Sequence, residues 1–119
     1  QAFADLDWLR TPACPEGYQH GYQSYPCMFR PDDLSLNNIK AVNTARNIWM
    51  EALQQVGIST RPATHAVHML SYYKNKYDIC STDFPNAYIS NECSISLPLF
   101  HGMSEAEQSY VIDSVIKSF

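Results

Sequence analysis

The longest regular pattern of apolar and polar positions covers residues 36–56. Apolar residues recur there at steps of three and four, the spacing that gives a helix one buried face. Ser35 stands where a residue could cap the start of such a helix, and Gly57 stands where a left-handed residue could end it. The pattern predicts one long amphipathic helix between these two residues.

Three further helices are predicted downstream of this one. The first covers residues 65–77, and the second is brief, covering residues 85–91 with Pro85 at an early position that tolerates proline. The third begins at residues 104–107, Ser-Glu-Ala-Glu, which form a capping box, and its apolar positions continue to Phe119.

Three segments between the helices have the character of strands. Residues 18–30 are rich in aromatic side chains, but Pro26 lacks a backbone donor and must lie at an edge, a bulge or an unbonded position. Residues 58–61 are short and β-branched, and we expect them to pair beside the first strand. Residues 93–97 alternate between polar and apolar positions and predict a third strand.

Short strands with enough helices to cover one face of a sheet predict a small α/β or α+β layer. Residues 1–16 are expected to be a linker or the end of an interdomain helix, with the domain itself at residues 17–119. The chain begins at Gln1 and opens abruptly in FADLDWLR, like the tail of a helix. We therefore expect a piece of a longer protein, the alternative being removal of a leader.

The composition argues against nucleic-acid binding and against a membrane span. The chain has 119 residues, a net charge of −4 and eight Lys and Arg residues, so we expect no face basic enough to follow a nucleic acid. No apolar run approaches the roughly 20 residues of a membrane span. The four cysteines could form two disulfides, but their wide spacing favours reduced thiols in a cytoplasmic protein.

Most chemically useful side chains fall within residues 57–73. On a helix His65 and His68 would face the same way and could bind a metal, a carboxylate or a phosphate, or could be structural. Arg61 follows a β-prone run and precedes Pro62, so its guanidinium could grip an anion with two hydrogen bonds, or could lie exposed at a strand end.

Other candidates carry less information. Tyr22 and Tyr25 could stack on a ligand or pack within the sheet. Cys93 with one of the two histidines could form a thiol–imidazole pair, although a strand does not suggest an activated thiol. No nucleophile elbow, phosphate-binding loop or dinucleotide fingerprint is present.

Three runs of the chain resemble the C-terminal part of the DegT/StrS-type sugar aminotransferases. They are YQHGYQSYPCMFRP, ARNIWMEALQQVGISTRPATHAVHMLSYY and DFPNAYISNECSISLPLFHGMSEAEQSYVIDSV. The matching positions are His20, Tyr22, Tyr25, Arg46, Gly57, Ile58, Thr60, residues 61–68, residues 96–99, Met103, Ser104 and Glu107. Pro26 departs from the apolar residue usual in the family, and RPATHAVH is a variant of its histidine-centred segment.

This resemblance implies the small C-terminal domain of a pyridoxal-phosphate enzyme of the aspartate-aminotransferase fold, with a short three- to four-stranded, mainly antiparallel sheet. The cofactor and its lysine would belong to a preceding large domain, so this segment would bind no cofactor and catalyse nothing alone. The enzyme would be a cytoplasmic homodimer that transfers an amino group from glutamate or glutamine to a nucleotide-linked keto-sugar.

The resemblance also assigns expected roles to residues. Arg61, His65 and His68 would face the sugar nucleotide, with Tyr22 and Tyr25 as further contacts, and no residue of the segment would bind a metal. The alternative is a free-standing binding or dimerisation module that has the fold without the chemistry.

Overall fold

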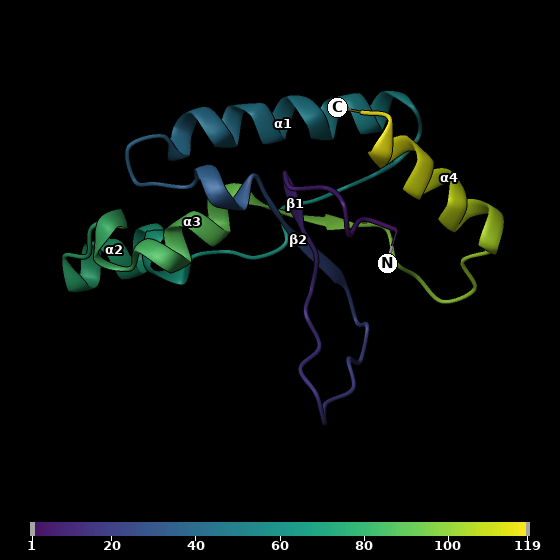
Figure 1. The fold of residues 1–119 in the computed structure, drawn as a ribbon. Helices are drawn as coiled ribbons and strands as arrows, with labels where there is room; N and C mark the ends of the chain where they lie inside the picture. The colour runs from purple at the N-terminus through teal and green to yellow at the C-terminus, as the bar shows by residue number, and fades with distance from the viewer. Residues whose placement is uncertain (1, 119) are drawn as a thin grey trace.

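The computed structural model describes residues 2–118 and contains one small sheet beneath a long helix (Figure 1). Strands β1 (Leu9–Arg10), β2 (Tyr25–Phe29) and β3 (Ser94–Leu97) are antiparallel and lie in the order β1-β2-β3. Helix α1 (Ile39–Gln55) crosses above them. The predicted α/β layer with an antiparallel sheet is confirmed.

The remaining helices lie at the two ends of the sheet. Helices α2 and α3 form a lobe at one end, and α4 lies at the other (Figure 1). Their bounds are α2 (Ser71–Tyr77), α3 (Pro85–Cys93) and α4 (Glu105–Ile116), with 3-10 turns at Pro31–Asp33, Val67–Met69 and Ser81–Asp83. Phe119, predicted to extend the last helix, lies outside the described residues.

Helix α1 has the predicted buried stripe. Its buried residues Ile39, Val42, Arg46, Trp49 and Leu53 alternate at steps of three and four. Most of this stripe is apolar, so packing of one face against the sheet stabilises the helix more than local propensity does.

The C-terminal end of α1 was predicted correctly, and the N-terminal end was not. Gly57 has a φ of 81°, and its N–H donates to the Gln54 carbonyl at 3.0 Å, which confirms it as the left-handed terminator. Ser35 does not cap the helix. Its N–H instead donates to Asn38 Oδ1 at 2.9 Å, and this turn delays the helix start to Ile39.

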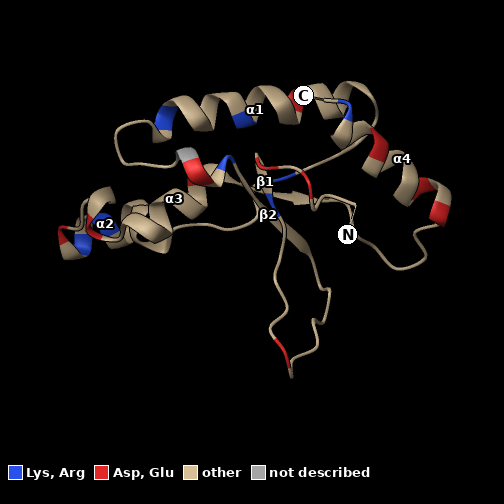
Figure 2. Cartoon of the chain, viewed as in Figure 1, with Lys and Arg blue, Asp and Glu red and all other residues tan. Residues whose placement is uncertain are grey.

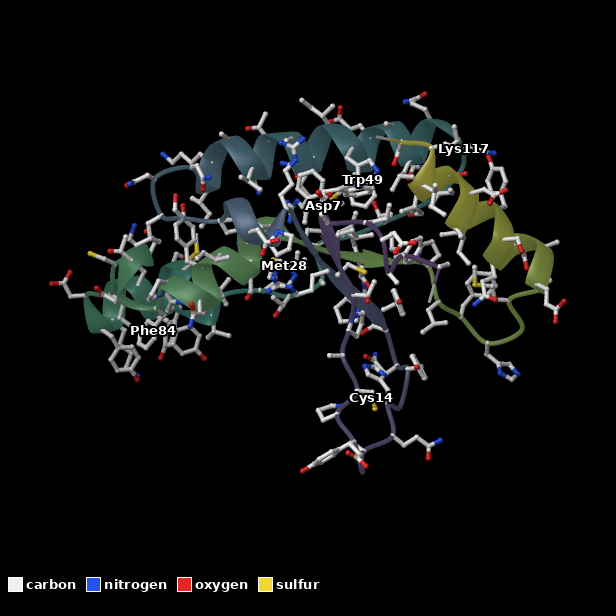
Figure 3. The ribbon with its side chains drawn as sticks, in the orientation of Figure 1. Asp7, Cys14, Met28, Trp49, Phe84 and Lys117 are labelled. Atoms are coloured by element: carbon white, nitrogen blue, oxygen red, sulfur yellow. The ribbon has the colours of Figure 1, made fainter. Side chains whose placement is uncertain are left out.

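An aromatic cluster joins α1 to the sheet. The rings of Trp8 and Trp49 meet edge to face with centroids 5.1 Å apart, and Phe29 stacks on Trp49 at 5.4 Å. Trp49 points from α1 toward the strands (Figure 3). Such pairs add roughly 0.5–1.5 kcal/mol each beyond burial of their area, so this cluster fixes the angle between helix and sheet.

The sheet order corrects two predictions. Residues 1–10, expected as a helix or linker, include β1, which pairs Leu9 with Phe29. Residues 58–61 form no strand beside β2, because β1 and β3 already occupy both its edges. Arg61 instead forms a single bridge to Ser96 on the outer edge of β3.

The first predicted strand, residues 18–30, is much shorter in the structure. Residues 11–24 form an arm that projects from the body, and Cys14 lies on it (Figures 1 and 3). Left-handed backbone at Gly17 (φ 83°) and Tyr22 (φ 45°) interrupts extended pairing there. Pro26 pairs with Ser96 in the half of β2 that β1 does not cover, which fits its missing donor.

The predicted helix at residues 65–77 is broken. Its first part is the 3-10 turn at Val67–Met69, and the extended backbone of Leu70 separates this turn from α2. Ala66 and His68 are both buried. The burial of these two side chains stabilises the broken arrangement more than local helix propensity stabilises a continuous helix.

A buried arginine ties α1 to the junction of α3 and β3. Arg46, 4% exposed, donates through Nη1 to the carbonyls of Ser94 (2.9 Å) and Asn91 (3.3 Å), and through Nη2 to Asn47 Oδ1 (2.7 Å). Burial lowers the pKa of Arg46 below its ordinary value. We call this set of hydrogen bonds the Arg46 clasp.

The predicted capping box at the start of α4 is confirmed. The Glu107 N–H donates to Ser104 Oγ at 3.2 Å, and the Ser104 N–H donates to Glu107 Oε2 at 2.8 Å. The Ser104 hydroxyl also donates to Glu107 Oε2, at 2.7 Å. The two hydrogen bonds from the Ser104 N–H and hydroxyl favour the carboxylate and hold the pKa of Glu107 below its ordinary value.

A lowered pKa means that the box stabilises α4 above the ordinary glutamate pKa and that this contribution is lost as the pH falls through the folded pKa. Glu107→Gln should abolish this acid-induced loosening of the first turn. Glu105→Gln, in the same turn, should leave it intact. Amide exchange of residues 104–108, measured by NMR as a function of pH, tests both variants. Equal pH profiles for Glu107→Gln and Glu105→Gln would contradict the attribution of the loosening to Glu107.

Candidate functional site

A wide hollow lies between α4 and the outer edge of the sheet. It has a volume of about 780 Å³, and we call it the α4 groove. Its walls come from residues 57–61, residues 96–100, the first turns of α4 and two residues at the base of the arm, Gln23 and Ser24.

The lining of the α4 groove is mainly apolar, and opposite charges and hydroxyl groups lie among its apolar side chains. Arg61 supplies a cation and Glu107 a carboxylate, and Thr60, Ser96 and Tyr110 supply hydroxyls. The Tyr110 hydroxyl donates to the Val56 carbonyl at 2.8 Å and so ties α4 to the end of α1. Such a surface can bind a polar ligand that carries both an anionic group and hydroxyls.

Of the five expected site residues, all within the described part of the chain, Arg61 alone lines the α4 groove. Its backbone is held on both sides: its N–H donates to the Ser96 carbonyl at 3.4 Å, and its carbonyl accepts from the Ser96 N–H at 2.7 Å. Pro62 then restricts the backbone immediately after it. The guanidinium is exposed at a fixed point of the chain.

The two expected tyrosines lie elsewhere. Tyr25 begins β2 opposite Leu97 and lines a second hollow of about 450 Å³ on the other side of residues 97–99. Burial raises the pKa of its hydroxyl. Tyr22 is exposed on the arm, where its N–H donates to His20 Nδ1 at 2.8 Å and the two rings lie 4.5 Å apart.

The two histidines do not share a helix face as predicted. His65 is exposed and precedes the 3-10 turn. His68 is 9% exposed, its Nε2 lies 3.2 Å from the Ser81 carbonyl, and the centres of its ring and the Phe84 ring are 5.1 Å apart. Phe84 lies in the α2–α3 lobe (Figure 3). The broken helix is the reason, since only a continuous one would align the two rings.

The two buried thiols are poorly suited to nucleophilic chemistry. Cys27 and Cys93 are buried, and burial raises their pKa values to about 12 and about 11. This disfavours the thiol–imidazole pair considered for Cys93. Cys14 and Cys80 are exposed, and all four cysteines are free thiols.

Sequence reasoning missed several groove residues. Glu107, Tyr110 and Ser96 were assigned to structural motifs or not considered as contacts, yet they face the same hollow as Arg61. One signal was available: the SLPL and MSEAE runs follow each other closely, so the end of one strand and the start of the last helix had to be near neighbours.

The described part of the chain has two further negative features. No group of three or more His, Cys, Asp or Glu side chains there is arranged to hold a metal ion. None of its helices is long and apolar enough to cross a membrane. Charged residues are sparse, with acidic residues along α4 and lysines on α2 (Figure 2).

These features define a class: a small α/β domain that offers a mainly apolar groove with an exposed arginine at its wall. Residues 21–116 match the DegT/DnrJ/EryC1/StrS aminotransferase family, and the chain belongs to this family.

Two curated relatives illustrate the match. MJ1066 of Methanocaldococcus jannaschii, an uncharacterised protein, is 27% identical over 117 residues, covering 98% of this chain and 28% of the relative. The spore coat polysaccharide biosynthesis protein SpsC of Bacillus subtilis is 27% identical over 114 residues, covering 96% of this chain and 28% of the relative. The chain thus spans little more than a quarter of each relative's length.

Solved structures share the fold. The apo form of Spr1654 of Streptococcus pneumoniae, named as a sugar aminotransferase, superposes with a TM-score of 0.80 at 23% identity, covering 98% of this chain and 27% of that one. PseC of Helicobacter pylori, an aminotransferase of pseudoaminic acid biosynthesis, gives 0.75 at 15% identity, covering 99% and 29%. Spr1654 has also been solved in forms with pyridoxal phosphate and pyridoxamine phosphate.

The lysines of this chain do not fit a pyridoxal-phosphate site. Lys40, Lys74, Lys76 and Lys117 are all exposed, and none lines the α4 groove or the second hollow. Lys76 Nζ lies 5.3 Å from the centre of the Tyr77 ring, and Lys117 pairs with Asp113 at 3.9 Å.

Proposed function

We propose that this chain is the C-terminal domain of a pyridoxal-phosphate-dependent aminotransferase that acts on a nucleotide-linked keto-sugar, with glutamate or glutamine as the amino donor. The domain closes the active site and is not catalytic alone. The cofactor, which would accept and return the amino group, and its lysine belong to a preceding large domain of the same protein. The whole enzyme would be a cytoplasmic homodimer.

The observation that carries the proposal is the place of Arg61. It combines a fixed backbone, an exposed guanidinium and a groove that also contains a carboxylate and hydroxyls. A guanidinium makes paired, charge-assisted hydrogen bonds to phosphate or carboxylate oxygens. The phosphates of a sugar nucleotide match the cation, and the sugar hydroxyls match the neutral polar groups of the groove.

The other expected residues take different roles in the proposal. His65 and Tyr22 are exposed and can contact the substrate as the domains close. Tyr25 and His68 are partly or largely buried, so we propose that they contribute to the site by supporting the segments that carry Tyr22 and His65. This domain would bind and orient the substrate and exclude water from it, with no covalent step of its own.

The test is amino transfer by the full-length protein loaded with pyridoxal phosphate. We expect it to show the absorption band of a lysine-bound cofactor and to transfer the amino group of glutamate or glutamine to a nucleotide-linked keto-sugar. The 119-residue chain alone should do neither. A full-length protein without the band and without transfer would sink the proposal and favour the binding or dimerisation module.

A further inference from the structure

The segment that carries Arg61 and His65 is attached to the domain at two points. At the first, Arg61 pairs with Ser96 of β3 through both backbone groups. At the second, the N–H of Ala66 donates to the side-chain oxygen Oδ1 of Asn91 at 2.9 Å. Between these points residues 62–65 cross the surface, so the two attachments determine their path.

Asn91 is well suited to hold the second point. It lies in the last turn of α3, and its side-chain Nδ2 donates to Glu92 Oε1 at 2.7 Å, which orients the amide so that its oxygen faces Ala66. Its backbone carbonyl separately accepts a hydrogen bond from Arg46 at 3.3 Å. The acceptor is therefore fixed at both the main chain and the side chain.

The side chain of Asn91 is not needed for the clasp between α1 and α3. Arg46 donates to the backbone carbonyl of Asn91 and not to its side chain, and any residue at position 91 supplies the same carbonyl. The side-chain oxygen of Asn91 instead accepts a hydrogen bond from the N–H of Ala66, a residue that is 4% exposed. Loss of this oxygen would leave the N–H of a buried residue without its acceptor and release the segment, while the clasp remains.

We propose that Asn91 is a positioning residue: its side-chain oxygen holds the backbone at Ala66 so that Arg61 and His65 face the substrate. This inference rests on the proposed function. Displacement of groups that bind the substrate weakens binding, so loss of the hydrogen bond that holds this segment should appear as a raised KM for the sugar nucleotide.

The experiment uses three variants of the full-length enzyme. Asn91→Ala removes the acceptor. Asn91→Asp combined with Glu92→Gln keeps an acceptor at position 91, because the new amide at position 92 can donate to the second carboxylate oxygen. Asn86→Ala is the matched control, an exposed asparagine of the same helix. We expect Asn91→Ala to raise the KM for the keto-sugar nucleotide about tenfold with kcat within about twofold. The double variant and Asn86→Ala should stay within about threefold of the parent KM.

Hydrogen exchange adds a readout that does not depend on activity. The peptide covering residues 61–70 should exchange faster in Asn91→Ala only. If Asn91→Ala does not fold, Asn91→Gln, which moves the oxygen by one methylene group, replaces it with the same expectations. An unchanged KM, in a background where Arg61→Ala raises it, would overturn the positioning role and leave the proposed function standing. A parent KM in both Asn91→Ala and Arg61→Ala would overturn the positioning role and the proposed function together.

Discussion

Replacing Arg46 by Ala should lower the free energy of unfolding by about 3 kcal/mol, because the change leaves the buried Ser94 carbonyl without its donor and removes two half-buried hydrogen bonds. The carbonyls of Asn91 and Ser94 and the side chain of Asn47 all accept from this guanidinium. Hydrogen bonds from charged donors contribute roughly 1.5–3 kcal/mol each, and an unsatisfied buried acceptor costs a comparable amount. The Arg46 clasp is thus a large single contribution to the stability of the domain.

Urea unfolding of the 119-residue chain measures this effect. Arg46→Lys keeps the charge but not the planar fork, so it should lose about half as much. The control is Arg10→Ala, because Arg10 pairs with Asp32 at 3.0 Å with both side chains largely exposed, and such pairs contribute less than about 1 kcal/mol. Equal losses for Arg46→Ala and Arg10→Ala would show that the clasp is not stabilising.

The Arg46 clasp also connects the fold to the proposed site. The clasp holds the last turn of α3 in place. From there Asn91 accepts a hydrogen bond from Ala66, and the chain continues into β3. β3 in turn pairs with Arg61 through Ser96. A buried residue of α1 therefore determines, through backbone contacts, where the exposed arginine of the groove lies.

Local patterns predicted the elements that depend on local physics. The stripe of α1, its terminator Gly57, the capping box of α4 and the early proline of α3 were all readable, because each is specified within a few residues. The pairing of strands was not. β1 has only two residues, and its place beside Phe29 depends on partners far apart in the sequence.

The candidate site was predicted less well for the same reason. Arg61 could be picked out because a guanidinium before a proline is a rigid, exposed arrangement. The alignment of His65 with His68 failed because burial of His68 against Phe84 and the Ser81 carbonyl broke the expected helix. The positioning side chain of Asn91 had no signal at all, since a hydrogen bond across 25 residues leaves no local pattern.

Arg61→Ala should raise the KM for the keto-sugar nucleotide by about tenfold to a hundredfold, the second large effect that the structure predicts. The loss of a charge-assisted pair of hydrogen bonds costs roughly 1.5–3 kcal/mol, and each 1.4 kcal/mol corresponds to a factor of about ten. The backbone of Arg61 is held by Ser96 and not by its own side chain, so the variant should fold normally.

Steady-state kinetics of the full-length enzyme with Arg61→Ala is the most direct test of the claim that this domain supplies a substrate-facing arginine. The control is again Arg10→Ala, an exposed arginine that does not line the α4 groove. The account predicts a raised KM for the sugar nucleotide in Arg61→Ala, with kcat and the KM for the amino donor nearly unchanged, and parent values throughout in Arg10→Ala. A parent KM for the sugar nucleotide in a folded Arg61→Ala enzyme would contradict it.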